Sequence, residues 1–97
     1  MRIPLTELTN TSRTIYKGPA LLYSITISGD GAAGDCDVYD GVNSQGERKY
    51  HLEVGAGATV VVSLQNPVEL DRGLYVKVNA ATTFVTVQYE PLKEPID

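Results

Sequence analysis

The chain has 97 residues, of which 42% are hydrophobic and 21% are charged, and its formal net charge is −4. A length below 100 residues corresponds to one domain. The acidic balance argues against nucleic-acid binding, which needs a basic surface. Since no stretch approaches the roughly 20 apolar residues of a membrane-spanning helix, we expect neither a nucleic acid nor a membrane as a partner.

Cys36 is the only cysteine, so the chain cannot form an intrachain disulfide. A lone thiol is typical of a reducing compartment, and residues 1–13 lack the apolar block of a secretory signal. We therefore expect the protein in the cytoplasm of the producing cell. A domain of this size buries only roughly 60–68% of its unfolded surface, which favours a homo-oligomer as a further source of stability.

The N-terminal residues 1–13 show little periodicity. Pro4 and the polar run LTNTSR predict an extended N-terminal arm. A short first strand is expected over Thr14–Lys17, and it ends at Gly18-Pro19 because proline cannot donate to a ladder.

An alternation of apolar and polar side chains predicts a half-buried strand ending at Ser28. The inward face is expected to hold Leu21, Tyr23, Ile25 and Ile27. Leu22 falls on the opposite, outward face. A loop is expected over residues 29–34, since three glycines in six residues do not favour a strand.

Five further runs rich in β-branched and aromatic residues follow, each bounded by a turn signal: Asp37–Asp40, Arg48–Val54, Thr59–Gln65, Leu74–Asn79 and Thr83–Glu90. Asn66-Pro67 is expected to end the third of these runs, and residues 91–97 to form an extended C-terminal tail. About seven or eight short strands predict an all-β fold over residues 14–90, an antiparallel β-sandwich or jelly-roll-like barrel.

Several apolar side chains fall on the outward face of their predicted strands, where polar residues are expected. They are Leu22, Val61, Tyr75 and Phe84. Isolated exposed apolar residues are normal, but a gathered patch indicates a contact with another protein. We take these four as the candidate interface of a homo-oligomer.

Carboxylates and tyrosines offer the main binding chemistry. Asp30, Asp35, Asp37 and Asp40 lie close together in the sequence and could supply oxygen ligands to Ca²⁺. Their spacing is not that of an EF-hand, and aspartate is common in turns, so we expect no metal. Tyr16, Tyr39 and Tyr75 could instead form platforms for a sugar, which makes a small carbohydrate-binding module, Ca²⁺-dependent or not, the alternative function.

No catalytic motif is present. Cys36 and His51 are the sole residues of their types, and a catalytic dyad requires them within hydrogen-bond reach. Strand alternation places Cys36 inward with Val38 and His51 outward with Lys49. We therefore expect neither an enzyme nor a cofactor.

Three segments carry a resemblance to a known group of proteins: GPALLYSITISG, DVYDG and NPVELDRGLYVKVNAATTFVTVQYE. Together with their connections they resemble small β proteins encoded in the structural gene clusters of tailed bacteriophages and prophages, over residues 14 to 90. The resemblance implies a non-enzymatic virion component, of the head-decorating (cementing) or the tail-associated kind. It implies other capsid or tail proteins as partners, and localisation in the virion after assembly in the host bacterial cytoplasm.

Overall fold

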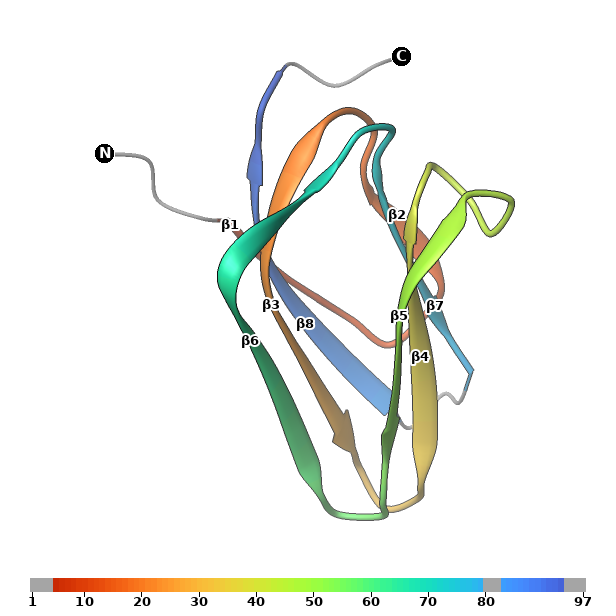
Figure 1. Ribbon diagram of the computed structural model, residues 1–97. Coiled ribbons are helices and arrows are strands. Elements are labelled where there is room, and N and C mark those ends of the chain that lie inside the picture. Colours follow the sequence, from red (N-terminus) through yellow and green to blue (C-terminus); the bar gives the residue numbers. More distant parts are fainter. Residues whose placement is uncertain (1–4, 80–82, 94–97) are drawn as a thin grey trace.

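The computed structural model describes residues 5–79 and 83–93, which contain eight strands and no helix. The strands are β1 (Leu5–Thr9), β2 (Arg13–Tyr16), β3 (Ala20–Gly29), β4 (Gly34–Asp40), β5 (Glu47–Val54), β6 (Thr59–Leu70), β7 (Leu74–Val78) and β8 (Thr83–Pro91). They form two antiparallel sheets with the orders β1-β8-β3-β6 and β2-β7-β4-β5. The two sheets face each other in two layers (Figure 1). This confirms the predicted all-β, antiparallel, sandwich-like fold.

The core lies between the two sheets, because each strand directs every second side chain inward. Its fully buried side chains are mostly β-branched or leucine: Leu22, Ile25, Ile27, Val38, Leu70, Leu74, Val76, Val85 and Val87, with Cys36 and Thr83 beside them. The predicted inward positions of Cys36 and Val38 on β4 are confirmed. No helix in the described ranges is long and apolar enough to cross a membrane.

β3 contains a β-bulge at Tyr23 that reverses the facing of the preceding side chains. β8 pairs Leu22 with Tyr89 and Ser24 with Gln88, so Tyr23 is the extra residue of β3 at this register shift. Leu22 is therefore fully buried, whereas Leu21 and Tyr23 are half-buried. The prediction that Leu22 faces outward was wrong, and so was the inward assignment of Leu21 and Tyr23, since simple alternation assumes an uninterrupted pleat.

β6 continues through Asn66-Pro67, where the sequence predicted its end. Opposite β3, Ser63 pairs with Ser24 and Val68 with Leu22, so residues 64–67 bulge against a single residue of β3. β6 lies at the edge of its sheet, and an irregular edge tolerates a proline because no neighbour needs its N–H.

The sheet begins earlier than predicted. Residues 5–9 of the expected arm form β1, which pairs with β8 from Leu5 opposite Tyr89 to Thr9 opposite Val85. Backbone pairing with β8 determines where this strand lies, because its side chains are largely exposed and do not alternate between buried and exposed positions. At the other end, the Leu92 N–H donates to the Pro19 carbonyl at 2.9 Å. Residues 1–4 of the expected arm and residues 94–97 of the expected tail lie outside the described residues.

Candidate functional site

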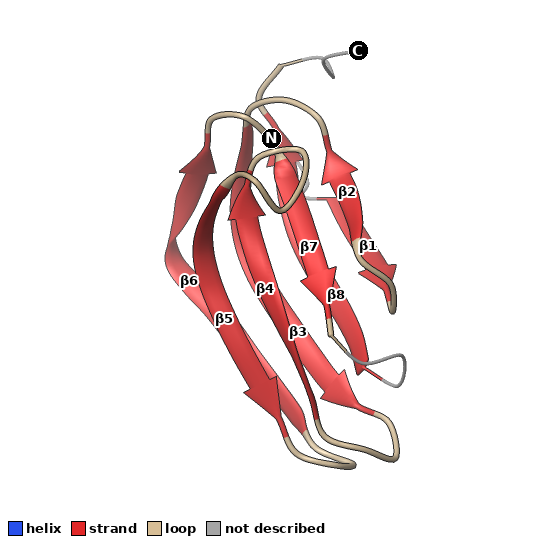
Figure 2. Ribbon diagram, turned by 90° about the vertical axis from the view of Figure 1, so that its right-hand side faces the viewer, coloured by secondary structure: helices blue, strands red, loops and turns tan. Residues whose placement is uncertain are grey.

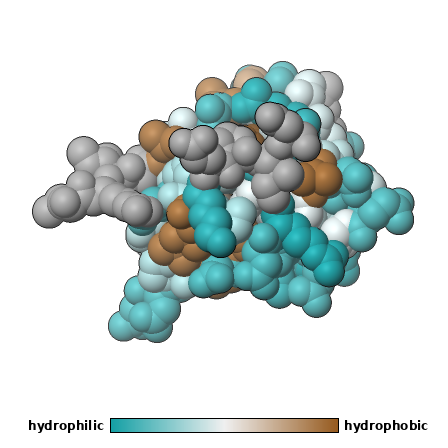
Figure 3. Space-filling model, turned by 90° about the horizontal axis from the view of Figure 1, so that it is seen from above, coloured by the Kyte–Doolittle hydropathy of each residue, from teal (hydrophilic) through white to brown (hydrophobic). Residues whose placement is uncertain are grey.

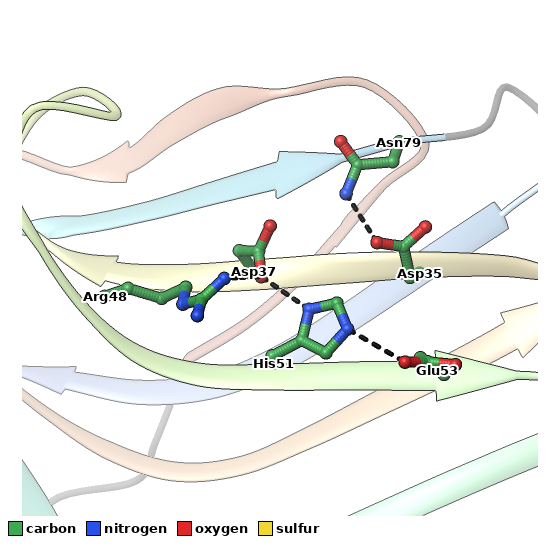
Figure 4. Close-up of polar contacts among 6 residues, drawn as sticks. All are labelled: Asp35, Asp37, Arg48, His51, Glu53 and Asn79. Atoms are coloured by element: carbon green, nitrogen blue, oxygen red, sulfur yellow. Dashed lines mark hydrogen bonds and ion pairs between the residues drawn. The ribbon is translucent and has the colours of Figure 1, made fainter.

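The outer face of the second sheet carries a cluster of polar side chains at the middle of β4 and β5. Asp35 and Asp37 alternate with buried Cys36 on β4, and His51 alternates with buried Leu52 on β5. The antiparallel register places Asp37 opposite His51 and Asp35 opposite Glu53. All these polar side chains therefore gather on one surface (Figure 4).

Short contacts connect the members of this cluster. The Nδ1 atom of His51 lies 2.6 Å from Oδ1 of Asp37, and its Nε2 atom lies 3.2 Å from Oε2 of Glu53. Arg48 approaches the same Asp37 oxygen at 3.5 Å. On the far side of β4, the Asn79 amide donates to Asp35 at 2.8 Å. The Asp37 side chain is 9% exposed. Its carboxylate therefore interacts with His51 and Arg48 at a position that is largely shielded from solvent.

These contacts change the protonation of His51. The hydrogen bond to Asp37, and after it the hydrogen bond to Glu53, raise the pKa of His51 above its ordinary value of 6.5. A carboxylate that accepts from the imidazole stabilises its protonated form. The cluster therefore favours an ion pair between His51 and Asp37 at mildly acidic pH.

Within the described residues, Asp35, Asp37 and His51 are the group best placed to hold a metal ion, with one ligand atom from each within 4.8 Å of the others. Carboxylate oxygen and imidazole nitrogen are ligands that Zn²⁺ accepts. In this structure the same side chains are engaged by Asn79 and Arg48. A cation would have to displace those donors.

The four aspartates proposed from the sequence as Ca²⁺ ligands do not come together. Asp35 and Asp37 share a face of β4, but Asp30 lies exposed in the loop after β3. Asp40 is buried, and its carboxylate accepts the backbone N–H groups of Asp71 at 3.1 Å and Arg72 at 2.9 Å. Asp40 thus holds the β6–β7 turn, a role with no local signal in the sequence because its partners lie about 30 residues away.

Cys36 and His51 lie on opposite faces of the second sheet, as the alternation predicted. Cys36 is fully buried, and its neighbour across the ladder is Leu52. Burial, and then the negative charges of Asp37 and Asp35, raise the pKa of the Cys36 thiol to about 12. The thiolate that a nucleophilic cysteine requires is therefore strongly disfavoured at neutral pH.

The candidate tyrosines separate into two groups. Tyr39 and Tyr75 pair edge to face on the outer side of the second sheet, with ring centroids 5.9 Å apart. Both rings are half-buried. Tyr16 packs instead against Tyr89, and its hydroxyl donates to the Lys93 carbonyl. Only the first pair is thus next to the polar cluster.

The four candidate interface residues are not brought together either. Leu22 is in the core, which removes it from any surface. Val61 and Phe84 belong to the first sheet, on either side of β3, and Tyr75 belongs to the second sheet. Of these four, Val61 is the most accessible, at 62% exposure.

A second surface feature lies at the edge of the first sheet. Val60 and Val61 are both exposed at the start of β6, within the segment Thr59–Leu64, which has no charged residue. Leu5 and Leu8 are exposed at the opposite edge, on β1. Seen from above, by contrast, hydrophobic residues form small separate patches among hydrophilic ones (Figure 3). At the two edges of the first sheet, exposed apolar residues therefore lie on strands that are paired on one side only.

Comparisons of this chain with protein-family models, with curated proteins and with solved structures find no match.

Proposed function

We propose that this chain is a non-enzymatic structural subunit that associates with copies of itself and docks on the lattice of a tailed-phage virion. The observation that carries the proposal is the exposed, uncharged start of β6, with Val61 at 62% exposure. An edge strand offers unpaired N–H and C=O groups to another chain. Apolar side chains beside those groups favour burial over solvation, so the segment suits a lasting contact.

The strand orders support the finer part of the proposal, a jelly-roll topology. In a jelly roll, eight strands form two sheets through two Greek keys. The orders β1-β8-β3-β6 and β2-β7-β4-β5 are those that result when a long hairpin of eight strands is rolled up. Jelly rolls occur in viral capsid domains and in lectins. The virion assignment therefore rests on the resemblance of residues 14–90 to phage structural proteins, since a fold alone does not define a function.

Two measurements test this proposal. Light scattering at micromolar concentration is expected to give a molar mass above the 10.5 kDa of one chain. Val61→Lys places a positive charge on the edge and is expected to lower that mass. Ser44→Lys adds the same charge in an exposed loop and is expected to leave the mass unaltered. Mass spectrometry of purified particles then identifies the chain as a head or tail component, and its absence from them contradicts the virion role.

The tyrosine pair favours a second candidate, a carbohydrate-binding module. Tyr39 and Tyr75 present aromatic surface next to Arg48, which lies opposite Tyr39, and to Asp37, which is on the same face of β4. Sugar-binding sites combine an apolar ring face with polar hydrogen-bonding groups. A glycan array, run with and without EDTA, tests this candidate: binding that Tyr75→Ala abolishes would favour it over the structural role.

A further inference from the structure

The four edge strands of the described sheets differ in how they are protected. Edge strands are commonly protected from pairing with another chain by their short length or by charged side chains. β1 and β2 have five and four residues, and they carry Glu7 and Arg13, which form an ion pair. β5 has eight residues with charged side chains on its exposed face. β6 has 12 residues. Pro67 and the bulge over residues 64–67 interrupt its second half, but the part over Thr59–Ser63 has no charge, proline or register shift.

The hydrogen-bond pattern shows which backbone groups of β6 are free. The Gly29 N–H donates to the Ala58 carbonyl at 3.0 Å, and the register continues with Ser28 opposite Thr59. Hydrogen-bonded pairs recur at every second position of an antiparallel ladder. Val60 and Val62 therefore direct their backbone groups towards β3. Val61 directs its N–H and C=O to the open edge.

We propose that Thr59–Ser63 pairs antiparallel with the same segment of a second copy, around a twofold axis at Val61. This inference rests on the self-association in the proposed function and specifies its geometry. The two first sheets, of four strands each, then become one continuous sheet of eight strands. A twofold contact uses the same patch on both subunits and closes on itself.

The segment is complementary to itself in this register. Val61 lies opposite Val61 of the second copy, Val60 opposite Val62, and Thr59 opposite Ser63, so apolar residues meet apolar ones and hydroxyls meet hydroxyls. Each chain has a net charge of −4, but the segment brings no like charges together.

The edge strand of the other layer is compatible with the same contact. β5 and β6 are the edge strands of the two sheets on the same side of the molecule (Figure 2). The acidic residues Glu47 and Glu53 of β5 are balanced by Arg48 and Lys49. Pairing with β1 of another copy is less favourable, because Glu7 would enter the contact.

A matched pair of proline variants tests this geometry. Val61→Pro removes an N–H that faces the open edge, so the chain is expected to fold cooperatively but to scatter light as a monomer. Val60→Pro removes an N–H that the ladder directs towards β3 and is expected to lower the Tm. An oligomer that persists in folded Val61→Pro overturns the inference and leaves the proposed self-association standing. A wild-type protein that is monomeric at all concentrations overturns both.

A cross-link tests the same contact if a proline variant does not fold. Opposite residues in a hydrogen-bonded pair have Cα atoms about 5.5 Å apart, within the range of a disulfide. Val61→Cys is expected to form a disulfide-linked dimer under mild oxidation, whereas Ser44→Cys remains a monomer on a denaturing gel. Failure of Val61→Cys to cross-link in an oligomeric sample contradicts the twofold pairing. If Val61→Cys cross-links only when it is mixed with Leu8→Cys, the contact lies between β6 and β1, which also contradicts the twofold pairing.

Discussion

The imidazole of His51 and the carboxylate of Asp37 lie 2.6 Å apart across the β4–β5 ladder. Because the hydrogen bonds to Asp37 and Glu53 raise the pKa of His51, we expect its titration midpoint, followed by NMR, to lie above 6.5. Asp37→Asn should lower this midpoint more than Glu53→Gln, since Asp37 makes the larger contribution. Equal midpoints in wild type and Asp37→Asn would show that the contact has no electrostatic effect.

The same pair predicts the pH dependence of stability. A group whose pKa is raised in the folded state binds protons more tightly there than in the unfolded state. Its contribution is therefore complete below the unfolded pKa of about 6.5, and it is lost as pH rises through the folded pKa. Denaturant titrations of wild type and His51→Gln should differ most at acidic pH and converge at alkaline pH. A difference in the free energy of unfolding that grows as pH rises would contradict this prediction.

The bulge at Tyr23 predicts opposite outcomes at two adjacent leucines. Leu22 is fully buried and Leu21 is half-buried. Leu22→Ala leaves a core cavity and should lower the free energy of unfolding by about 2–5 kcal/mol. Leu21→Ala should cost about 1 kcal/mol or less. Urea titration measures both, and a larger loss at Leu21 would mean that β3 has no bulge.

Replacing Asp40 should lower the free energy of unfolding, whereas replacing Asp30 should not. Asp40→Ala leaves the N–H groups of Asp71 and Arg72 without their acceptor, so we expect a loss of about 1–3 kcal/mol in the free energy of unfolding. Asp40→Asn keeps one acceptor oxygen and should lose less. Asp30→Ala, in an exposed loop, should stay within about 0.5 kcal/mol. Equal effects at the two aspartates would contradict the role of Asp40 in the turn.

The thiol of Cys36 should be unreactive in the folded protein. Its side chain is fully buried, and its pKa is raised to about 12. A thiol reagent at pH 8 is therefore expected to label the chain only in denaturant, at a rate that follows unfolding. Rapid labelling of the native protein would show that the second sheet opens at β4.

The sequence predicted the class of fold and most strand positions, because side-chain alternation records which face each strand buries. Leu74 and Val76 on β7, and Val85 and Val87 on β8, follow this rule without interruption. The rule failed at Tyr23, since a bulge reverses the facing of residues without any change in composition. It also missed β1, whose place depends on backbone pairing with β8.

The candidate site was predictable only in part. Alternation separated Cys36 from His51, because it states which face each position within a strand occupies. The contact between Asp37 and His51 depends on the register of β4 against β5, and a single sequence does not specify that register. The free edge of β6 is likewise a property of strand order, although the uncharged run Thr59–Leu64 was visible in the sequence.

Hydrogen exchange at the Val61 amide tests the contact between β6 edges most directly. The alternation of the ladder directs this N–H to the open edge and the neighbouring Val60 N–H towards β3. If two copies pair through this edge, the Val61 amide should exchange more slowly as the protein concentration rises, while the Val60 amide remains protected throughout. Fast exchange at Val61 that is independent of concentration would contradict the pairing.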